Sequence, residues 1–393
     1  MRDLAVFDLF CGTGGFSYGM EHSGLGFNTR FGIDMLSVAT ETFKLNHCGA
    51  VAMCGDIRKA RRAAVEEATK LGKGAVDVLV GGPPCQGFSS IRPFRSTNDD
   101  DPRNTLFEEY ASFVNYFRPR VFVLENVVGL ATHKNGDTVA AMEECFHALG
   151  YTTEWRLLNA AHFGVPQKRE RFVMFGVEQG IKIQFPKPTH FYEGSTVGYR
   201  DRSRIISARV GDLFDACPTL QPAVTVMDAI GDLPCVESGD EAVEYTMPPK
   251  NTYQTERRRG ATALSMHAST AHSKKMLEII RHSGKNINCI PKHLITSGFS
   301  SSYSRLDADE PSVTLTVNFV HPASNRCIHP IQQRALTARE GARLQSYDDT
   351  FQFAGNRTQV VKQIGNAVPV LVSKAMGEHI VERLQTSRFG DHG

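Results

Sequence analysis

Short apolar segments alternate with helical ones in the first half of the chain, and this pattern constrains the fold more than any other feature. The strand-like segments are residues 5–10, 27–33, 76–80 and 121–124. Residues 15–23 and the stretch that ends at His47 have the character of helices. Such alternation favours a parallel sheet with helices on both faces. We therefore predict an α/β fold on a doubly wound, mostly parallel sheet.

The alternation ends near residue 185, which predicts a change of domain. Residues 186–357 are rich in Pro, Ser, Arg and Gly and contain few long periodic elements before Leu336, so we expect a second, smaller and irregular domain there. Residues 1–185 would form the larger domain, and residues 358–393 would return to it. Apolar residues at helical spacing between residues 360 and 384 predict one closing helix that packs on the sheet.

Composition excludes several classes of protein. Hydrophobic residues make up 41% and charged residues 22% of the 393 residues, which are ordinary globular values. No apolar run approaches the roughly 20 residues of a membrane span, and we find no secretory leader, so we expect a cytoplasmic protein. The nine cysteines are an odd number without zinc-like spacing. They predict reduced thiols and no metal site.

Positive charge is concentrated in residues 250–292. That segment carries nine Lys and Arg against two acids, a local balance of +7 in a chain whose net charge is +2. A cluster of this kind predicts contact with a polyanion such as a nucleic-acid backbone. A merely solvated basic face remains the alternative.

A glycine-rich turn follows the first strand. It reads Phe10-Cys11-Gly12-Thr13-Gly14-Gly15 and opens a helix, as expected where a nucleoside-bearing ligand approaches the backbone. The spacing departs from Gly-x-Gly-x-x-Gly, which disfavours a nicotinamide dinucleotide. The turn therefore predicts a nucleoside site of another kind.

Two acids follow later strand ends. Asp34 comes after the second strand, where a carboxylate suits ribose hydroxyls, and Asp56 is placed to accept from an adenine amine. Either acid alone is more often the N-cap of a helix. Together with the glycine turn, both favour a ligand.

The segment after the strand at residues 76–80 carries the sharpest local signal. It reads Gly81-Gly82-Pro83-Pro84-Cys85-Gln86, which places a thiol at the carboxyl end of a buried strand. A lone cysteine is usually a small core residue, but this position is typical of a nucleophile. Glu125 follows the next strand and is expected at the same rim, unless it only caps the segment after it.

These segments resemble the motifs of DNA (cytosine-5) methyltransferases, in the family's order. The resemblance rests on residues 8–16, 83–86, 125–127, 167–171, 334–346 and 363–369. It spans nearly the whole chain except about residues 186–300, where that family has its variable target-recognition domain. It implies the fold of S-adenosylmethionine-dependent methyltransferases, with S-adenosylmethionine as the methyl donor and carbon 5 of cytosine as the acceptor.

The resemblance also assigns catalytic roles. The Cys85 thiolate would add to carbon 6 of cytosine, and so make carbon 5 able to attack the methyl group. Glu125 would hydrogen-bond ring nitrogen 3 and the exocyclic amine. Arg169 and Arg171, two apart on a strand, would hold the base oxygen, phosphates and the catalytic loop, unless they form only a solvated basic edge.

Thirteen residues are expected to bind the cofactor. They are Phe10, Gly12, Thr13, Gly14, Gly15, Asp34, Met35, Asp56, Ile57, Pro83, Leu106, Asn366 and Ala367. Met35 departs from the large aromatic residue that many members have near the adenine. A thioether packs there as well, so we expect altered affinity without loss of binding.

A cytosine inside a duplex is out of reach, so the resemblance implies that the base is flipped out. The long polar segment after Cys85 is expected to close over it as a lid. The candidate DNA contacts are Gln86, Ser89, Arg92, Arg95, Arg103, Arg257, Arg258 and Arg259.

Three functions remain open at this point. The favoured one is a monomeric, sequence-specific prokaryotic DNA methyltransferase with a possible cognate restriction endonuclease. A tRNA cytosine-5 methyltransferase is disfavoured because the recognition region lacks the Cys-Phe-Thr triplet typical of that group. A catalytically silent DNA-binding protein is disfavoured by the intact set of Cys85, Glu125, Arg169 and Arg171.

Overall fold

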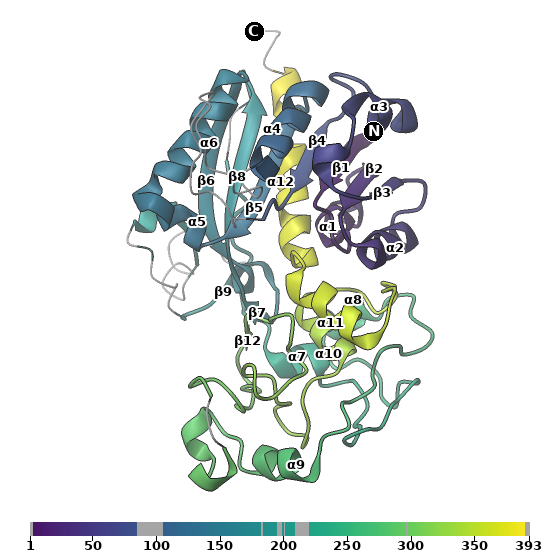
Figure 1. The fold of residues 1–393 in the computed structure, drawn as a ribbon, viewed down its shortest axis with the longest axis vertical. Helices are drawn as coiled ribbons and strands as arrows, with labels where there is room; N and C mark the ends of the chain where they lie inside the picture. The colour runs from purple at the N-terminus through teal and green to yellow at the C-terminus, as the bar shows by residue number, and fades with distance from the viewer. Residues whose placement is uncertain are drawn as a thin grey trace.

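A computed structural model describes residues 3–84, 105–181, 184–194, 199, 201–208, 220–295 and 298–389. Its centre is an eight-stranded sheet in the order β10-β6-β8-β5-β4-β1-β2-β3 (Figure 1). These strands are β1 (Leu4–Leu9), β2 (Phe27–Asp34), β3 (Val51–Cys54), β4 (Val78–Gly81), β5 (Val121–Val127), β6 (Tyr151–Asn159), β8 (Glu170–Glu178) and β10 (Ile205–Ile206). β8 runs antiparallel to both β5 and β6, and the other pairs are parallel. The predicted doubly wound, mostly parallel sheet is confirmed.

Helices cover both faces of this sheet. One face packs against α3 (Arg62–Thr69), α4 (Thr105–Phe117), α5 (Gly129–Thr132) and α6 (Asp137–Ala148). The other packs against α1 (Gly15–Glu21) and α12 (Val370–Phe389). Strand β5 shows why both faces need cover, because Phe122 and Leu124 enter one apolar cluster and Val121 and Val123 enter the other. Helix α2 (Ser37–Asn46) follows β2.

A second, mostly irregular lobe lies below the sheet in Figure 1. Its regular elements are α7 (Val226–Ile230), α8 (Thr252–Arg257), α9 (Lys274–Arg281), α10 (Ala338–Leu344) and α11 (Arg357–Asn366). Four of these helices, α7, α8, α10 and α11, share one apolar cluster. Helix α9 lies at the far end of the lobe (Figure 1).

Short strands connect the lobe to the sheet. β7 (Gln167–Lys168) pairs in parallel with β12 (Ser312–Val313), and β9 (His190–Phe191) pairs with β11 (Gln221–Pro222). Side chains reinforce the first pair, since the Gln167 side chain donates to Leu344 O and accepts from Leu315 N. The lobe is therefore fixed next to the start of β8.

The prediction of one closing helix is wrong in one respect. The segment forms two helices, α11 and α12, separated by residues 367–369. Pro369 explains the break, because proline lacks the N–H that would continue α11 and restricts the residue before it. None of the helices among the described residues is both long and apolar enough to cross a membrane.

Candidate active site

A cavity of about 830 Å³ opens at the carboxyl ends of β1, β2, β4 and β5. Its walls come from the turn after β1, the segments after β2 and β3, the turn after β4, and the end of β5. Residues 314–317 and 363–368 close it from the side of the second lobe. Its volume lies in the range of small-molecule and cofactor sites. The structure therefore gathers residues from both ends of the chain around one space.

The glycine turn forms the floor of this cavity. Phe10, Gly12 and Gly14 all have left-handed backbone, with φ of 56°, 52° and 79°. Glycine adopts this region freely, whereas Phe10 does so at a cost that its surroundings must offset. The Gly12 N–H donates to Asp34 Oδ2 at 3.0 Å, which joins the turn to the end of β2.

Buried polar side chains support the turn from below. The Ser17 hydroxyl donates to Asp8 Oδ2 at 2.7 Å. His47 lies within hydrogen-bond distance of the Gly14 carbonyl oxygen, at 3.2 Å, and of Glu21 Oε2, at 2.7 Å. Burial raises the pKa of Asp8 to about 6. The turn is therefore held by a network that ordinary strand and helix patterns did not reveal.

Two acids face the apolar end of the cavity. Asp34 accepts from the N–H groups of Gly12 and Leu36, and burial raises the pKa of its carboxyl group. Asp56 caps the 3₁₀ turn that follows β3 and pairs with Arg58, whose guanidinium lowers the pKa of that carboxyl group. The N-cap interpretation is thus right for Asp56, although this residue also lines the cavity.

Glu125 is held at the opposite end of the cavity. Arg171 Nε donates to Glu125 Oε1 at 2.7 Å, and both side chains are mostly buried, with exposures of 14% and 13%. Asn126 Nδ2 donates to Pro83 O at 2.8 Å and so fixes the turn that leads to Cys85. A carboxylate and a guanidinium are therefore oriented beside the turn after β4.

Arg169 and Arg171 have different surroundings. Arg169 is 3% exposed, and its Nη1 and Nη2 donate to Leu315 O and Gly365 O. Burial lowers the pKa of its guanidinium to about 9. The solvated-edge interpretation is therefore wrong for Arg169, because this side chain joins the wall of the cavity to both segments that close it.

Comparison with known proteins identifies the chemistry of the chain. The family model of C-5 cytosine-specific DNA methylases matches residues 4–382. The chain belongs to this family. Members of the family take the transferred methyl group from S-adenosylmethionine, so the methyltransferase uses that cofactor.

Two relatives match this methyltransferase along most of its length. Type II methyltransferase M.AgeI of Thalassovita gelatinovora is 33% identical over 96% of this chain and 99% of its own. Type II methyltransferase M1.HphI of Haemophilus parahaemolyticus is 34% identical over 96% of this chain and 87% of its own.

Solved structures share the fold. One is a structure from an E. coli prophage, described as a DNA modification methyltransferase, which has a TM-score of 0.72 and 23% identity and covers 98% of this chain and 100% of its own. S. pombe Dnmt2 methyltransferase has a TM-score of 0.60 and 16% identity, with 97% and 99% of the two chains covered. These likenesses concern the fold alone.

The cavity of the methyltransferase fits an adenosyl cofactor. Its apolar end combines Phe10, Ile57 and the 60% exposed Met35 with the carboxyl groups of Asp34 and Asp56. Of the thirteen expected cofactor residues, Gly14 is the one that does not itself line the cavity. The others are Phe10, Gly12, Thr13, Gly15, Asp34, Met35, Asp56, Ile57, Pro83, Leu106, Asn366 and Ala367.

The predicted DNA contacts divide into three groups. Gln86, Ser89, Arg92, Arg95 and Arg103 lie outside the described residues, as does Cys85, the predicted nucleophile. Arg259 is exposed, as a DNA contact requires.

The prediction is wrong for Arg257 and unsupported for Arg258. Arg257 is 7% exposed, pairs with Asp348 at 3.1 Å and donates to Ser346 O. Arg258 pairs with Asp232 and lies over the Tyr245 ring. A run of arginines in the sequence does not reveal which of them have internal partners.

Sequence reasoning missed three contributors to the site. Residues 314–317 line the cavity; they lie within residues 300–319, which resemble the segment that ends the recognition domain in this family, but that resemblance did not indicate a place in the cavity. His47 and Tyr347 contact the glycine turn from distant parts of the chain. No local pattern predicts such contacts.

Proposed function

We propose that this methyltransferase modifies carbon 5 of one cytosine within a short specific sequence of duplex DNA. The observation that carries the proposal is the single cavity that has the glycine turn and Asp34 at one end and the Glu125–Arg171 pair at the other. A methyl donor and a flipped base can meet in such a space. Base flipping requires a few kcal/mol, which contacts elsewhere on the DNA offset.

Each end of the cavity has its own task. S-adenosylmethionine, when bound, supplies the methyl group. Asp34 would accept from the ribose hydroxyls, Phe10 would lie against the adenine, Asp56 and Ile57 would meet its edge, and residues 12–15 would approach the methionine part.

Cys85 would carry out the covalent step. Its thiolate adds to carbon 6 of cytosine, which raises the electron density at carbon 5. Glu125 hydrogen-bonds nitrogen 3 and the exocyclic amine, and so stabilises the charge that develops as the thiolate adds. Arg171 holds Glu125 in place by its short hydrogen bond. After methyl transfer the carbon 5 proton leaves to water, and the Cys85 sulfur is eliminated.

Three parts of the chain would divide this work. Residues 1–185 would bind the cofactor and perform the chemistry, residues 186–357 would recognise the target, and residues 358–393 would return to the catalytic domain. The exposed basic residues of the second lobe support its role on DNA. They include Lys250, Arg259, Lys274, Lys275, Arg281, Lys285 and Lys292.

The cellular context follows from the relatives. M.AgeI and M1.HphI are named Type II methyltransferases, so we infer a restriction-modification role, with a cognate endonuclease that cuts the same site. The enzyme would act as a cytoplasmic monomer on the chromosome.

Base-resolution mapping of 5-methylcytosine tests the proposal. The chain is expressed in a bacterial host without DNA methylation, beside Cys85→Ser and the matched control Cys235→Ser, which alters an exposed cysteine. We expect one short methylated motif with the wild type and the control, and none with Cys85→Ser. Methylation retained by Cys85→Ser would overturn the covalent mechanism. Unmodified DNA together with methylated tRNA would favour the RNA alternative, and no activity on either would favour a silent DNA binder.

A further inference from the structure

Tyr347 contacts the cofactor turn from the far end of the chain. This side chain is fully buried, and its hydroxyl lies 2.6 Å from Thr13 Oγ1. Thr13 Oγ1 also accepts from the Gly15 N–H at 3.3 Å. The contact is tight, because a Cβ added at Gly15 would lie 2.3 Å from the Tyr347 hydroxyl. Tyr347 is therefore one wall of the turn at residues 12–15.

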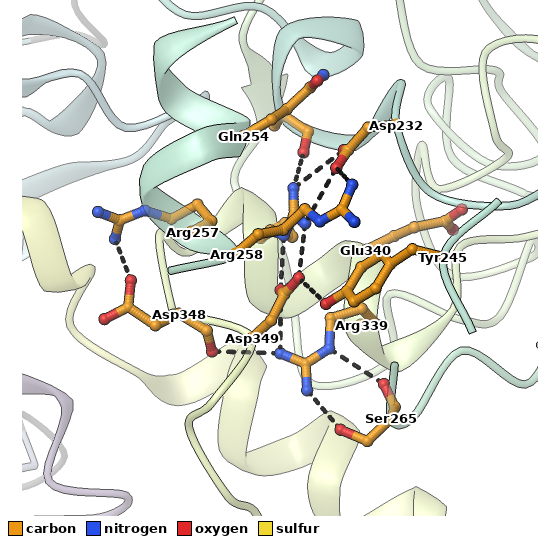
Figure 2. A network of polar contacts seen from close by, with 12 residues as sticks. Asp232, Tyr245, Gln254, Arg257, Arg258, Ser265, Arg339, Glu340, Asp348 and Asp349 are labelled. Atoms are coloured by element: carbon orange, nitrogen blue, oxygen red, sulfur yellow. Dashed lines mark hydrogen bonds and ion pairs between the residues drawn. The ribbon is translucent and has the colours of Figure 1, made fainter. Parts of the chain in front are cut away.

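The next residue, Asp348, has partners in two different parts of the molecule. Its Oδ2 accepts from the Tyr18 hydroxyl at 3.1 Å, and Tyr18 belongs to α1, the helix that begins at the glycine turn. Its Oδ1 pairs with Arg257 of α8 at 3.1 Å, as Figure 2 shows. One carboxylate thus joins the second lobe to the helix that follows the cofactor turn.

The backbone at this point is held firmly. Ser346 has a left-handed backbone with φ of 61°, and its carbonyl oxygen accepts from Arg257 Nη1 at 2.6 Å. Its hydroxyl donates to Gln345 O and accepts from the Leu371 N–H. A non-glycine residue keeps this conformation only where its surroundings determine it. Because this backbone has little freedom, a displacement of α8 would also displace residues 347 and 348.

We propose that Tyr347 and Asp348 are positioning residues that hold the cofactor turn and couple it to Arg257 in the recognition lobe. The inference rests on the proposed binding of the cofactor at residues 12–15. Tyr347 fixes the turn through Thr13, and Asp348 fixes α1 through Tyr18. Cofactor affinity consequently depends on a side chain in the lobe proposed to bind DNA.

Binding of S-adenosylhomocysteine to the full chain, measured by calorimetry, tests the first contact. Tyr347→Phe removes one buried hydroxyl, and loss of one such hydrogen bond should weaken binding about five-fold. Thr13→Val should weaken it by a similar factor. Because both changes remove the same contact, the affinity of the double variant should be no lower than that of the single variant that binds S-adenosylhomocysteine more weakly.

Tyr151→Phe is the matched control. It also removes a buried tyrosine hydroxyl, at the start of β6, which donates to Pro119 O and in the described part of the chain contacts neither α8 nor the turn, so the affinity of this variant should equal that of the wild type. In steady-state assays, Tyr347→Phe should raise the KM for S-adenosylmethionine more than it lowers kcat. If the fold-losses in affinity of Tyr347→Phe and Thr13→Val multiply in the double variant, the Tyr347–Thr13 contact is not the cause of the losses, and the inference is overturned.

A second pair of variants tests the coupling. Arg257→Gln removes the partner of Asp348, whereas Arg258→Gln alters the neighbouring arginine, which pairs with Asp232. We expect Arg257→Gln to weaken S-adenosylhomocysteine binding at least two-fold, Arg257→Lys to recover part of it, and Arg258→Gln to leave it unchanged. Thermal melts confirm that each variant is folded.

The outcomes separate the inference from its premise. If the wild type binds S-adenosylhomocysteine and the Arg257→Gln and Tyr347→Phe variants bind it with the same affinity, the inference is overturned while the cofactor placement stands. Binding unaffected by Asp34→Asn and Phe10→Ala would instead overturn the cofactor placement, and the inference with it.

Discussion

Replacement of Glu125 by glutamine tests the catalytic end of the cavity most directly. The side chain keeps its size, and Arg171 Nε can still donate to the amide oxygen where it now donates to Glu125 Oε1 at 2.7 Å. What is lost is the negative charge and the ability to carry a proton to nitrogen 3 of cytosine. The variant should therefore remain folded and bind its ligands while the chemical step slows.

The magnitude follows from the chemistry and the burial of the pair. Proton transfer by a positioned group contributes about 10²–10⁴ in rate, so kcat should fall by that factor, which corresponds to about 3–5 kcal/mol in the activation free energy. Arg171 is only 14% exposed and loses its charged partner, so the free energy of unfolding should fall by about 1–3 kcal/mol.

Single-turnover transfer of a labelled methyl group to the cognate duplex measures this effect. The matched control is Glu154→Gln, which breaks the Glu154–Arg156 ion pair on β6, where the two side chains are 31% and 25% exposed. The control should transfer at the wild-type rate, since an exposed pair contributes little. A folded Glu125→Gln variant within about tenfold of the wild-type rate would refute the role that we assign to Glu125.

Three further predictions concern stability and DNA binding. Arg343→Met removes the cation that Asp232 and Asp349 share and leaves these buried carboxylates only their contacts with Arg258 and Arg339, so it should lower the free energy of unfolding by about 3–5 kcal/mol in denaturant titrations. The control Arg156→Met, which breaks a more exposed pair, should change it by less than about 1 kcal/mol. Burial raises the pKa of Asp8 to about 6, so its contribution to the free energy of unfolding is fully present below pH 3.8 and is lost as the pH rises to about 6. Relative to Asp8→Asn, the free energy of unfolding of the wild type should therefore fall by about 3 kcal/mol between these pH values. Parallel pH profiles of the two proteins would contradict this. Lys275→Gln should lower the slope of log Kd against log salt by about one, with exposed Lys44→Gln as the control; an unchanged slope would remove Lys275 from the DNA interface.

Strand ends were the part of the site that could be predicted from sequence. Apolar strands that are buried on both faces contrast sharply with the polar residues that follow them, so Phe10, Asp34 and Glu125 were recognisable as candidates. The carboxyl ends of parallel strands lie at one edge, which is why the structure brings these residues around a single cavity.

Contacts between distant segments were beyond such reasoning. The Tyr347 hydroxyl meets Thr13 across 334 positions of the chain, and this proximity depends on the packing of the second lobe. The same limit explains the wrong prediction for Arg257, because its internal partner Asp348 lies far away in the sequence. Local charge and periodicity predict which side of an element is polar or apolar, but they do not predict which distant residue a side chain contacts.

The buried charges around α10 suit a part of the molecule that must keep one geometry. Arg343 pairs with Asp232 and Asp349. Arg339 reaches Asp349 and the Ser265 hydroxyl, as Figure 2 shows. Apolar residues of similar volume often stabilise a core as well or better, so stability alone does not explain this arrangement. Directional hydrogen bonds, however, lose much of their energy when one partner rotates or slides. A recognition lobe held together by such contacts has few alternative internal arrangements, and a rigid lobe is needed if it is to present the target base accurately to the cavity where Glu125 and the methyl donor would meet.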